Sequence, residues 1–236
     1  MNIVDVLIIL LILCGAVVGF KRGVLSELVM TVGFLLVFII SFYLKNPLAE
    51  WFSLYLPFFS FGGIVEGATV LNIILYQLIA FIIVFAVIMV IFKVILTVTG
   101  FIEKILKFTI ILGIPSKILG AVVGAIEGYI IAFIVVFIFN QPMFDVGIMN
   151  DSKYKDRILN STPVLTDVVS SVGDTVTDVY KLIENNKDNM NSDEFNRESI
   201  NIMLKHKMIT VSYVEKLIDY GKIRIPGIDS VLNNYR

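Results

Sequence analysis

The strongest constraint on this chain is a run of 26 residues without a charged side chain, from Gly67 to Phe92. A helix needs about 20 mainly apolar residues to cross the hydrocarbon core of a bilayer. A run of this length therefore predicts a membrane-spanning helix. Lys93 follows directly and can extend its amine to the lipid headgroups.

Three further segments have the length and apolar content of spanning helices. We expect spans over residues 3–20, 24–44, 70–96 and 118–139. The first span carries a single charge, Asp5, and its basic pair lies after the apolar run. A signal peptide has its basic residues before that run, so we interpret this segment as a retained helix.

The composition agrees with a membrane protein and divides the chain in two. Hydrophobic residues make up 57% of the sequence and charged residues 17%, whereas soluble domains have about 25% charged residues. The first 139 residues hold 13 charged side chains, and the last 97 hold 26. The sequence therefore predicts a transmembrane domain over 1–139 and a soluble tail over 140–236.

Two segments between the spans are typical of the membrane surface. Residues 45–68 combine aromatic side chains with Pro47 and Pro57, and aromatic residues concentrate at the membrane–water interface. We expect the second span to end at Lys45–Pro47. Residues 97–117 alternate apolar and charged side chains as an amphipathic interfacial helix does, and Gly113 and Pro115 are expected to end it.

The tail has the signals of a helical structure. Thr162 before Pro163 is a typical helix start, and valine and leucine then repeat at helical spacing. Residues 185–194 indicate a linker, with a helix from about Ser192 to Lys205. The remaining signals are a capping-box pattern at Ser212 and Glu215, a stop at Gly221 and a short helix after Pro226. The fold class is therefore all-α.

The lysine and arginine residues near the spans predict the orientation. The junction after the first span has Lys21 and Arg22, and residues 93–117 hold four lysines, whereas the 45–68 segment has only Lys45 near a span end. Basic junctions face the cytoplasm. We therefore expect both termini, and the whole tail, on the outer side.

A glycine pattern occurs twice. Residues 15–23 and 120–128 both read GAVVGxxxG, which places Gly15, Gly19 and Gly23 in one copy and Gly120, Gly124 and Gly128 in the other. Residues four apart share a helix face, so each copy forms a groove that admits a neighbouring backbone. This predicts helix packing. A second interpretation is an internal repeat whose helices line a common axis, as in some transporters.

The same region resembles the CvpA (colicin V production) family of membrane proteins. Asp5, Gly19, Arg22, Gly23 and Glu27 match its first motif in order. Its second motif is matched by Ser116-Lys117, Leu119-Gly120, Gly124 and Gly128, and the segment from Asn150 to Pro163 is also similar. Glu127 stands where this family usually has an arginine, so a role that needs that positive charge is not expected here.

The resemblance implies a multi-pass protein of the bacterial plasma (inner) membrane, with a part in toxin production or export and in envelope maintenance. Some relatives carry a trypsin-like protease domain after the four helices. The tail of this chain has no such nucleophile motif, and we expect its one histidine, His206, to be a surface residue without partners.

Ionisable side chains at membrane depth are functional candidates because they are costly there unless paired or hydrated. Asp5, Arg22 and Glu27 lie near span ends, and we expect interface anchoring or pairing of the acids with Lys21 or Arg22. Glu127 lies about 14 Å along the fourth helix from Ile118, which is mid-bilayer. We expect it to need a polar partner, with Asn72 and Gln77 as candidates.

Other classes of function find little support in the residues. The net charge of −1 does not indicate a nucleic-acid partner. With one cysteine, Cys14, and one histidine, the chain offers no motif for a metal site, a cofactor or catalysis, so we expect no enzyme activity.

Two hypotheses remain open. One is a scaffold or accessory protein that binds envelope proteins or a second copy of itself within the lipid bilayer. The other is a small oligomeric channel or transporter that uses Glu127.

Overall fold

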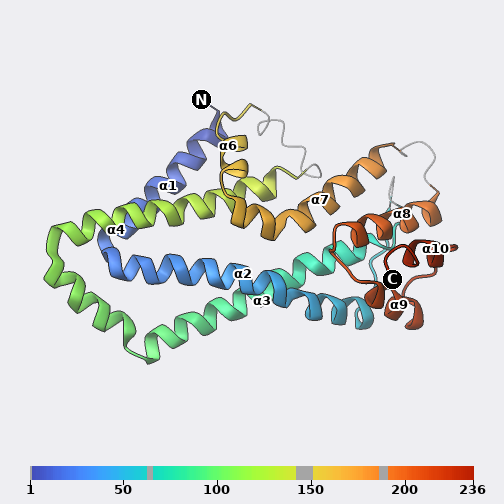
Figure 1. The fold of residues 1–236 in the computed structure, drawn as a ribbon, viewed down its shortest axis with the longest axis horizontal. Coiled ribbons are helices and arrows are strands. Elements are labelled where there is room, and N and C mark those ends of the chain that lie inside the picture. The colour runs from blue at the N-terminus through green and yellow to red at the C-terminus, as the bar shows by residue number, and fades with distance from the viewer. Residues whose placement is uncertain (1, 63–65, 142–150, 186–190) are drawn as a thin grey trace. The chain divides into compact units, whose positions relative to one another are not determined.

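The computed structural model describes residues 2–62, 66–141, 151–185 and 191–236, with the backbone alone for 101–112. Within these ranges the chain is helical and has no strand (Figure 1). The all-α prediction is confirmed. The helices are α1 (Ile3–Arg22), α2 (Val24–Tyr55), α3 (Leu71–Val98), α4 (Phe101–Phe139), α6 (Lys155–Asn160), α7 (Pro163–Asn185), α8 (Ser192–Lys205), α9 (Val211–Asp219) and α10 (Ile228–Leu232).

Four of the described segments are long and apolar enough to cross a membrane: Ile3–Arg22, Val24–Tyr55, Leu71–Val98 and Gly113–Phe139. Their apolar side chains are largely exposed rather than packed in a core. In the most apolar window of α3 only 6% of the residues are buried. Side chains of this kind are stable only against lipid or another apolar surface. The protein is therefore an all-α membrane protein.

The turn between α1 and α2 consists of one residue, Gly23. Its φ of 79° and ψ of 163° belong to a region that only glycine adopts readily. The Gly23 amide donates to the Gly19 carbonyl, and the Gly23 carbonyl accepts from the Glu27 amide. Gly23 thus ends α1 and allows α2 to begin at the next residue.

The second helix continues beyond its expected end at Lys45–Pro47 and reaches Tyr55 with Pro47 inside it. That prediction is wrong because contacts with the tail stabilise the extra turns. The Tyr213 hydroxyl of α9 donates to Ser53 at 2.5 Å, and Lys216 pairs with Glu50 at 2.5 Å. At 32 residues the helix is about 48 Å long, which exceeds the hydrocarbon thickness of about 30 Å.

A break at Gly113 divides α4. The residue has φ 57° and ψ −139°, and Pro115 follows in the first turn of the next section, where proline is favoured. The predicted stop at Gly113 is confirmed. The spanning section that follows begins at Gly113, earlier than its expected start at Ile118. The predicted division of side chains between two faces of 97–117 falls mainly on 101–112, which lie outside the described side chains.

The chain forms two compact units, and α2, α3 and α7 contribute to both. One unit comprises residues 1–41 and 85–166, and the other comprises 42–84 and 167–236. The second unit has a hydrophobic core drawn from two parts of the sequence. Leu54, Ala68, Val70 and Ile73 come from α2, α3 and their connection, and Phe195, Ile200, Met203, Val214, Leu217 and Leu232 are among the contributions of the tail.

This shared core bears on the membrane topology. Asn196 of α8 accepts a hydrogen bond from the Val70 amide at 3.2 Å and donates to the Gly67 carbonyl at 2.9 Å, immediately before α3 begins. Groups in such contact must lie on one side of a bilayer. The tail and the α2–α3 connection therefore lie on the same side of the membrane. This agrees with two crossings between them, by α3 and by the Gly113–Phe139 section of α4.

Several details of the tail follow the sequence signals, and one does not. The helix starting at Pro163, the helix Ser192–Lys205 and the short helix after Pro226 are confirmed. The cap of α9 is Thr210, whose side chain accepts from the Tyr213 amide, so the predicted capping box at Ser212 is wrong. Within the linker predicted over 185–194, residues 186–190 lie outside the described residues.

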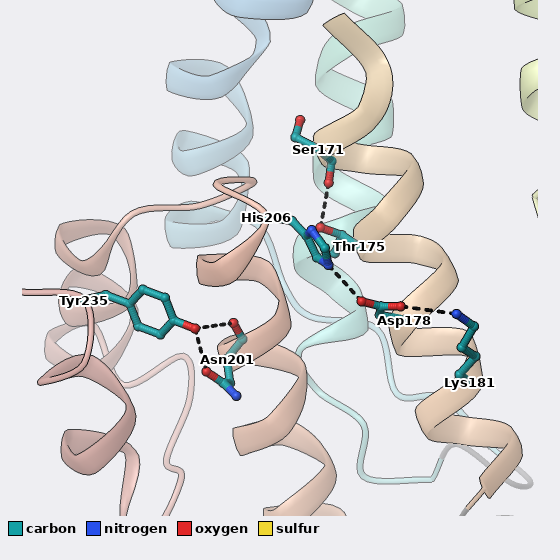
Figure 2. A network of polar contacts seen from close by, with 7 residues as sticks. All are labelled: Ser171, Thr175, Asp178, Lys181, Asn201, His206 and Tyr235. Atoms are coloured by element: carbon teal, nitrogen blue, oxygen red, sulfur yellow. Dashed lines mark hydrogen bonds and ion pairs between the residues drawn. The ribbon is translucent and has the colours of Figure 1, made fainter. Parts of the chain in front are cut away.

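His206 also differs from expectation, because it has a partner (Figure 2). Its Nε2 lies 2.8 Å from Asp178 Oδ2 of α7, and Lys181 lies 3.5 Å from the other carboxylate oxygen. The hydrogen bond with His206, together with the nearby positive charge of Lys181, lowers the pKa of Asp178. The pair joins the C-terminal end of α8 to α7.

We predict that Trp51 lies at the level of the lipid headgroups. It is the one tryptophan of the chain, it is half exposed, and its ring lies 5.5 Å from that of Tyr55. Full-length protein in bilayers should show stronger quenching of its fluorescence by lipids brominated near the headgroup than by lipids brominated at mid-chain. A variant with Trp51→Phe and Leu36→Trp, on an exposed mid-helix position, should show the reverse order. Equal profiles for the two proteins would contradict the assignment.

Candidate functional site

The first compact unit is organised by the pairing of α1 with α4 (Figure 1). Gly15 faces Gly124 and Gly128, whereas Gly19 faces Gly120 and Gly124. The partner number falls as the number along α1 rises, so the two helices are antiparallel. The two copies of the GAVVGxxxG pattern therefore lie against each other.

No side chain separates the two backbones at these positions. A Cβ built on Gly15, Gly19 or Gly124 would overlap a carbonyl of the opposite helix. Gly120 is similarly close to Gly23, and Gly128 is close to backbone atoms of Leu11 and Ile12. The structure thus brings all six predicted glycines to one helix–helix contact. Close backbone approach of this kind is how membrane helices associate without a hydrophobic driving force.

Glu27 lies in the first turn of α2, beside this contact. It is fully buried, with 0% of its surface exposed, and its carboxylate packs against Gly124 of α4. Oε2 lies 3.4 Å from Arg22, whose side chain is 41% exposed. Oε1 has no hydrogen-bond partner. Of the two roles expected for Glu27, the pairing with Arg22 is confirmed, and the buried carboxylate is an interior group rather than an interfacial anchor.

Glu127 of α4 lies at the same contact between α2 and α4. The Thr31 hydroxyl of α2 donates to its Oε2 at 3.3 Å. Thr31 lies one turn after Glu27 on α2, and Glu127 lies one turn after Gly124, against which Glu27 packs, so the two carboxyl groups are neighbours between the same helices. The polar partner expected for Glu127 exists, but the two candidates were wrong. Asn72 bonds to backbone groups of Phe59 and Thr69, and Gln77 accepts from Lys45 at 2.6 Å.

Thr31 was missed by the sequence analysis although a signal was present. It follows Glu27 by four residues, so both side chains share one face of α2. Ser116 was noted only as part of a motif. Its hydroxyl accepts from the Val24 amide at 3.3 Å and satisfies a donor at the start of α2. Both hydroxyls tie α2 to α4.

Asp5 lies apart from these groups, near the other end of α1. It is fully buried and accepts from the Ser152 hydroxyl at 2.7 Å and from the amides of Lys153 and Tyr154 at 3.0 and 3.4 Å. The predicted pairing with Lys21 or Arg22 is wrong for Asp5, since about 25 Å of helix separates them. Asp5 instead holds the segment that leads into α6.

The arrangement brings two carboxyl groups, one guanidinium group and one hydroxyl group together between membrane-spanning helices. Such a set can bind a positive charge or hold the helices together by hydrogen bonds. Within the described ranges, no three His, Cys, Asp or Glu side chains are placed to ligate a metal ion.

Comparison with known proteins identifies a family. The family model described as "Colicin V production protein" matches residues 4–162, which is more than half of the chain. No curated protein and no solved structure matches. The matched range contains both glycine patterns, the Glu27–Glu127 pair and the contacts of Asp5, and it ends directly before α7.

We predict that Gly124→Ala destabilises the protein. The added methyl group would overlap the Gly15 carbonyl and approach Glu27, and overpacking of this kind typically costs about 1–3 kcal/mol. The midpoint of thermal unfolding in detergent should fall by several degrees. Gly62→Ala is the matched control, because nothing lies within 4 Å of the Cβ built there. Similar midpoints for both variants would argue against the close contact.

We also predict that Asp5→Ala loosens residues 152–154. Removing the acceptor leaves buried donors unpaired, at about 1–3 kcal/mol for each. Hydrogen exchange at the Lys153 and Tyr154 amides should accelerate, whereas Asp151→Ala, at the neighbouring exposed carboxylate, should leave it unchanged. Unchanged exchange in Asp5→Ala would refute this role of Asp5.

Proposed function

Because the chain belongs to the Colicin V production protein family, we propose that it is a non-enzymatic accessory or scaffold protein of the bacterial inner membrane. It serves toxin production or export and envelope maintenance. The observation that carries this proposal is the glycine contact between α1 and α4. Backbones in direct contact over three turns form a rigid element, which suits a protein that holds partners in place.

The proposed partners are the lipid bilayer together with other envelope proteins or a second copy of the chain. The family match ends at residue 162, and the tail beyond it contributes most of the core of the second unit. This folded region offers a binding surface on the side of the α2–α3 connection. The exposed apolar face of α3 can contact lipid or a partner helix.

A second candidate function is a small oligomeric channel or transporter, and the Glu27–Glu127 pair is the observation that favours it. Carboxyl groups between spanning helices are typical of ion and proton pathways. The channel requires the carboxyl group of Glu127, whereas the accessory role does not.

Toxin release by a producing strain that lacks its own copy of the protein distinguishes the two functions. For an accessory protein, Glu127→Gln should retain release, whereas Gly124→Leu, which separates α1 from α4, should lose it. For a channel, Glu127→Gln should abolish release while the variant still inserts and accumulates. Solute movement by the purified protein in liposomes at an appreciable rate would overturn the accessory role.

We further propose that both termini lie outside, as the lysines and arginines near the spans predict. The test combines Cys14→Ser with Ser230→Cys, an exposed position of α10, and treats intact cells with a membrane-impermeant maleimide. Labelling is expected. As the control, Cys14→Ser is combined with Lys21→Cys instead, at the C-terminal end of α1. We expect this end in the cytoplasm, so the cysteine should be labelled only after the membrane is opened. The inverse result would place the tail in the cytoplasm.

A further inference from the structure

We propose that Glu27 and Glu127 form a binding site for one monovalent cation, H⁺ or Na⁺, between α2 and α4. The proposal goes beyond the accessory role, because such a site exists whether or not the protein moves a solute. It concerns the first compact unit alone. If the protein is a channel, the cation bound at this site is the ion that it carries.

The first argument is the unpaired oxygen of Glu27. The residue is fully buried, and its Oε1 is without a hydrogen-bond partner. An ionised carboxylate is costly in an apolar interior unless it is paired and hydrogen-bonded. The oxygen is directed toward Gly124 and the α4 backbone, so Arg22, which contacts Oε2, does not satisfy it.

The second argument is the balance of charge. Two carboxylates face one guanidinium group, which leaves one negative charge. The other bases whose side chains are described on α1, α2 and α4 do not neutralise this charge. Lys21 is exposed, Lys45 donates to Asn46 and Gln77, and the Lys117 amine lies 6.0 Å from the centre of the Phe20 ring. Asp5 lies near the other end of α1. One monovalent cation therefore makes the group neutral.

The third argument is the ligand set. Glu27 Oε1, the Glu127 carboxylate and the Thr31 hydroxyl oxygen come from two helices that Ser116 also ties together. Few oxygens are available, whereas Ca²⁺ takes six to eight and Mg²⁺ requires an octahedron. A proton shared by two carboxyl groups, or a Na⁺ ion between them, needs fewer oxygen ligands than Ca²⁺ or Mg²⁺. Gly124 provides the space, since a side chain there would displace the Glu27 carboxylate.

The test uses the full-length protein in lipid nanodiscs and a hydrophobic carbodiimide as the probe. A carboxylic acid adds across a C=N bond of the carbodiimide: its oxygen bonds to the central carbon and its proton goes to nitrogen. Only the protonated acid reacts in this way. We expect modification of Glu27 or Glu127, located by mass spectrometry of peptides, and a loss of modification as pH rises. The exposed Glu66 should remain unmodified.

Sodium distinguishes the two cations. Modification that Na⁺ suppresses but choline does not identifies a site at which Na⁺ competes with the proton. Modification that neither ion changes identifies a proton site. If both carboxyl groups stay unmodified over the whole pH range, in the presence and absence of Na⁺, the proposal is overturned.

Single substitutions test the charge balance. In Glu27→Gln, the one remaining carboxylate is balanced by Arg22, so modification of Glu127 should be lost as well, and Glu127→Gln should equally protect Glu27. If each variant leaves modification of the other carboxyl group unchanged, the two groups do not share one cation, and the proposal fails. Retention of the helical circular dichroism signal and of a monodisperse elution profile shows that a variant is folded. Because the readout is chemical modification, it does not depend on toxin release.

Discussion

The contact between the α1 and α4 backbones is the constraint on which the first compact unit depends. Within a bilayer, apolar side chains gain nothing by leaving lipid for one another, so helices associate through close packing and polar contacts. The two GAVVGxxxG patterns provide that packing because each presents a glycine every four residues. With the helices antiparallel, Gly19 and Gly124 lie at the middle of a contact that each copy makes with the other.

The polar groups depend on this contact. Gly23 turns the chain from α1 into α2 within one residue, which brings Glu27 beside α4. Glu27 can be buried there because Gly124 has no side chain, and Glu127 meets Thr31 on the same helix pair. The glycine pattern and the carboxyl pair are therefore one structural element. A larger residue at position 124 would disturb both the helix packing and the charged groups.

Asp5 and the second compact unit show how residues far apart in sequence are joined. Asp5 binds residues 152–154 through one hydroxyl and two amides, and Asn196 binds the chain directly before α3. In both cases a single polar side chain satisfies backbone groups that would otherwise be buried without partners. Tyr213 and Lys216 contact the side chains of Ser53 and Glu50 on the last turns of α2, which explains why that helix continues past Pro47.

The sequence by itself determined the all-α membrane fold, the four apolar helices and most helix limits in the tail. Hydrophobic length, proline and glycine act through neighbouring residues, so their effects can be read locally. It also identified Glu127 and both glycine patterns as candidates, since these are visible as a charge in an apolar run and as a spacing of four.

Only the tertiary structure decided which groups meet. The partners of Glu127, Asp5 and His206 lie 96, 147 and 28 positions away in the sequence, and no local signal specifies such pairs. The extension of α2 through Pro47 also required the structure. The loss of one backbone hydrogen bond at a proline is a local effect, and packing against α9 overrides it.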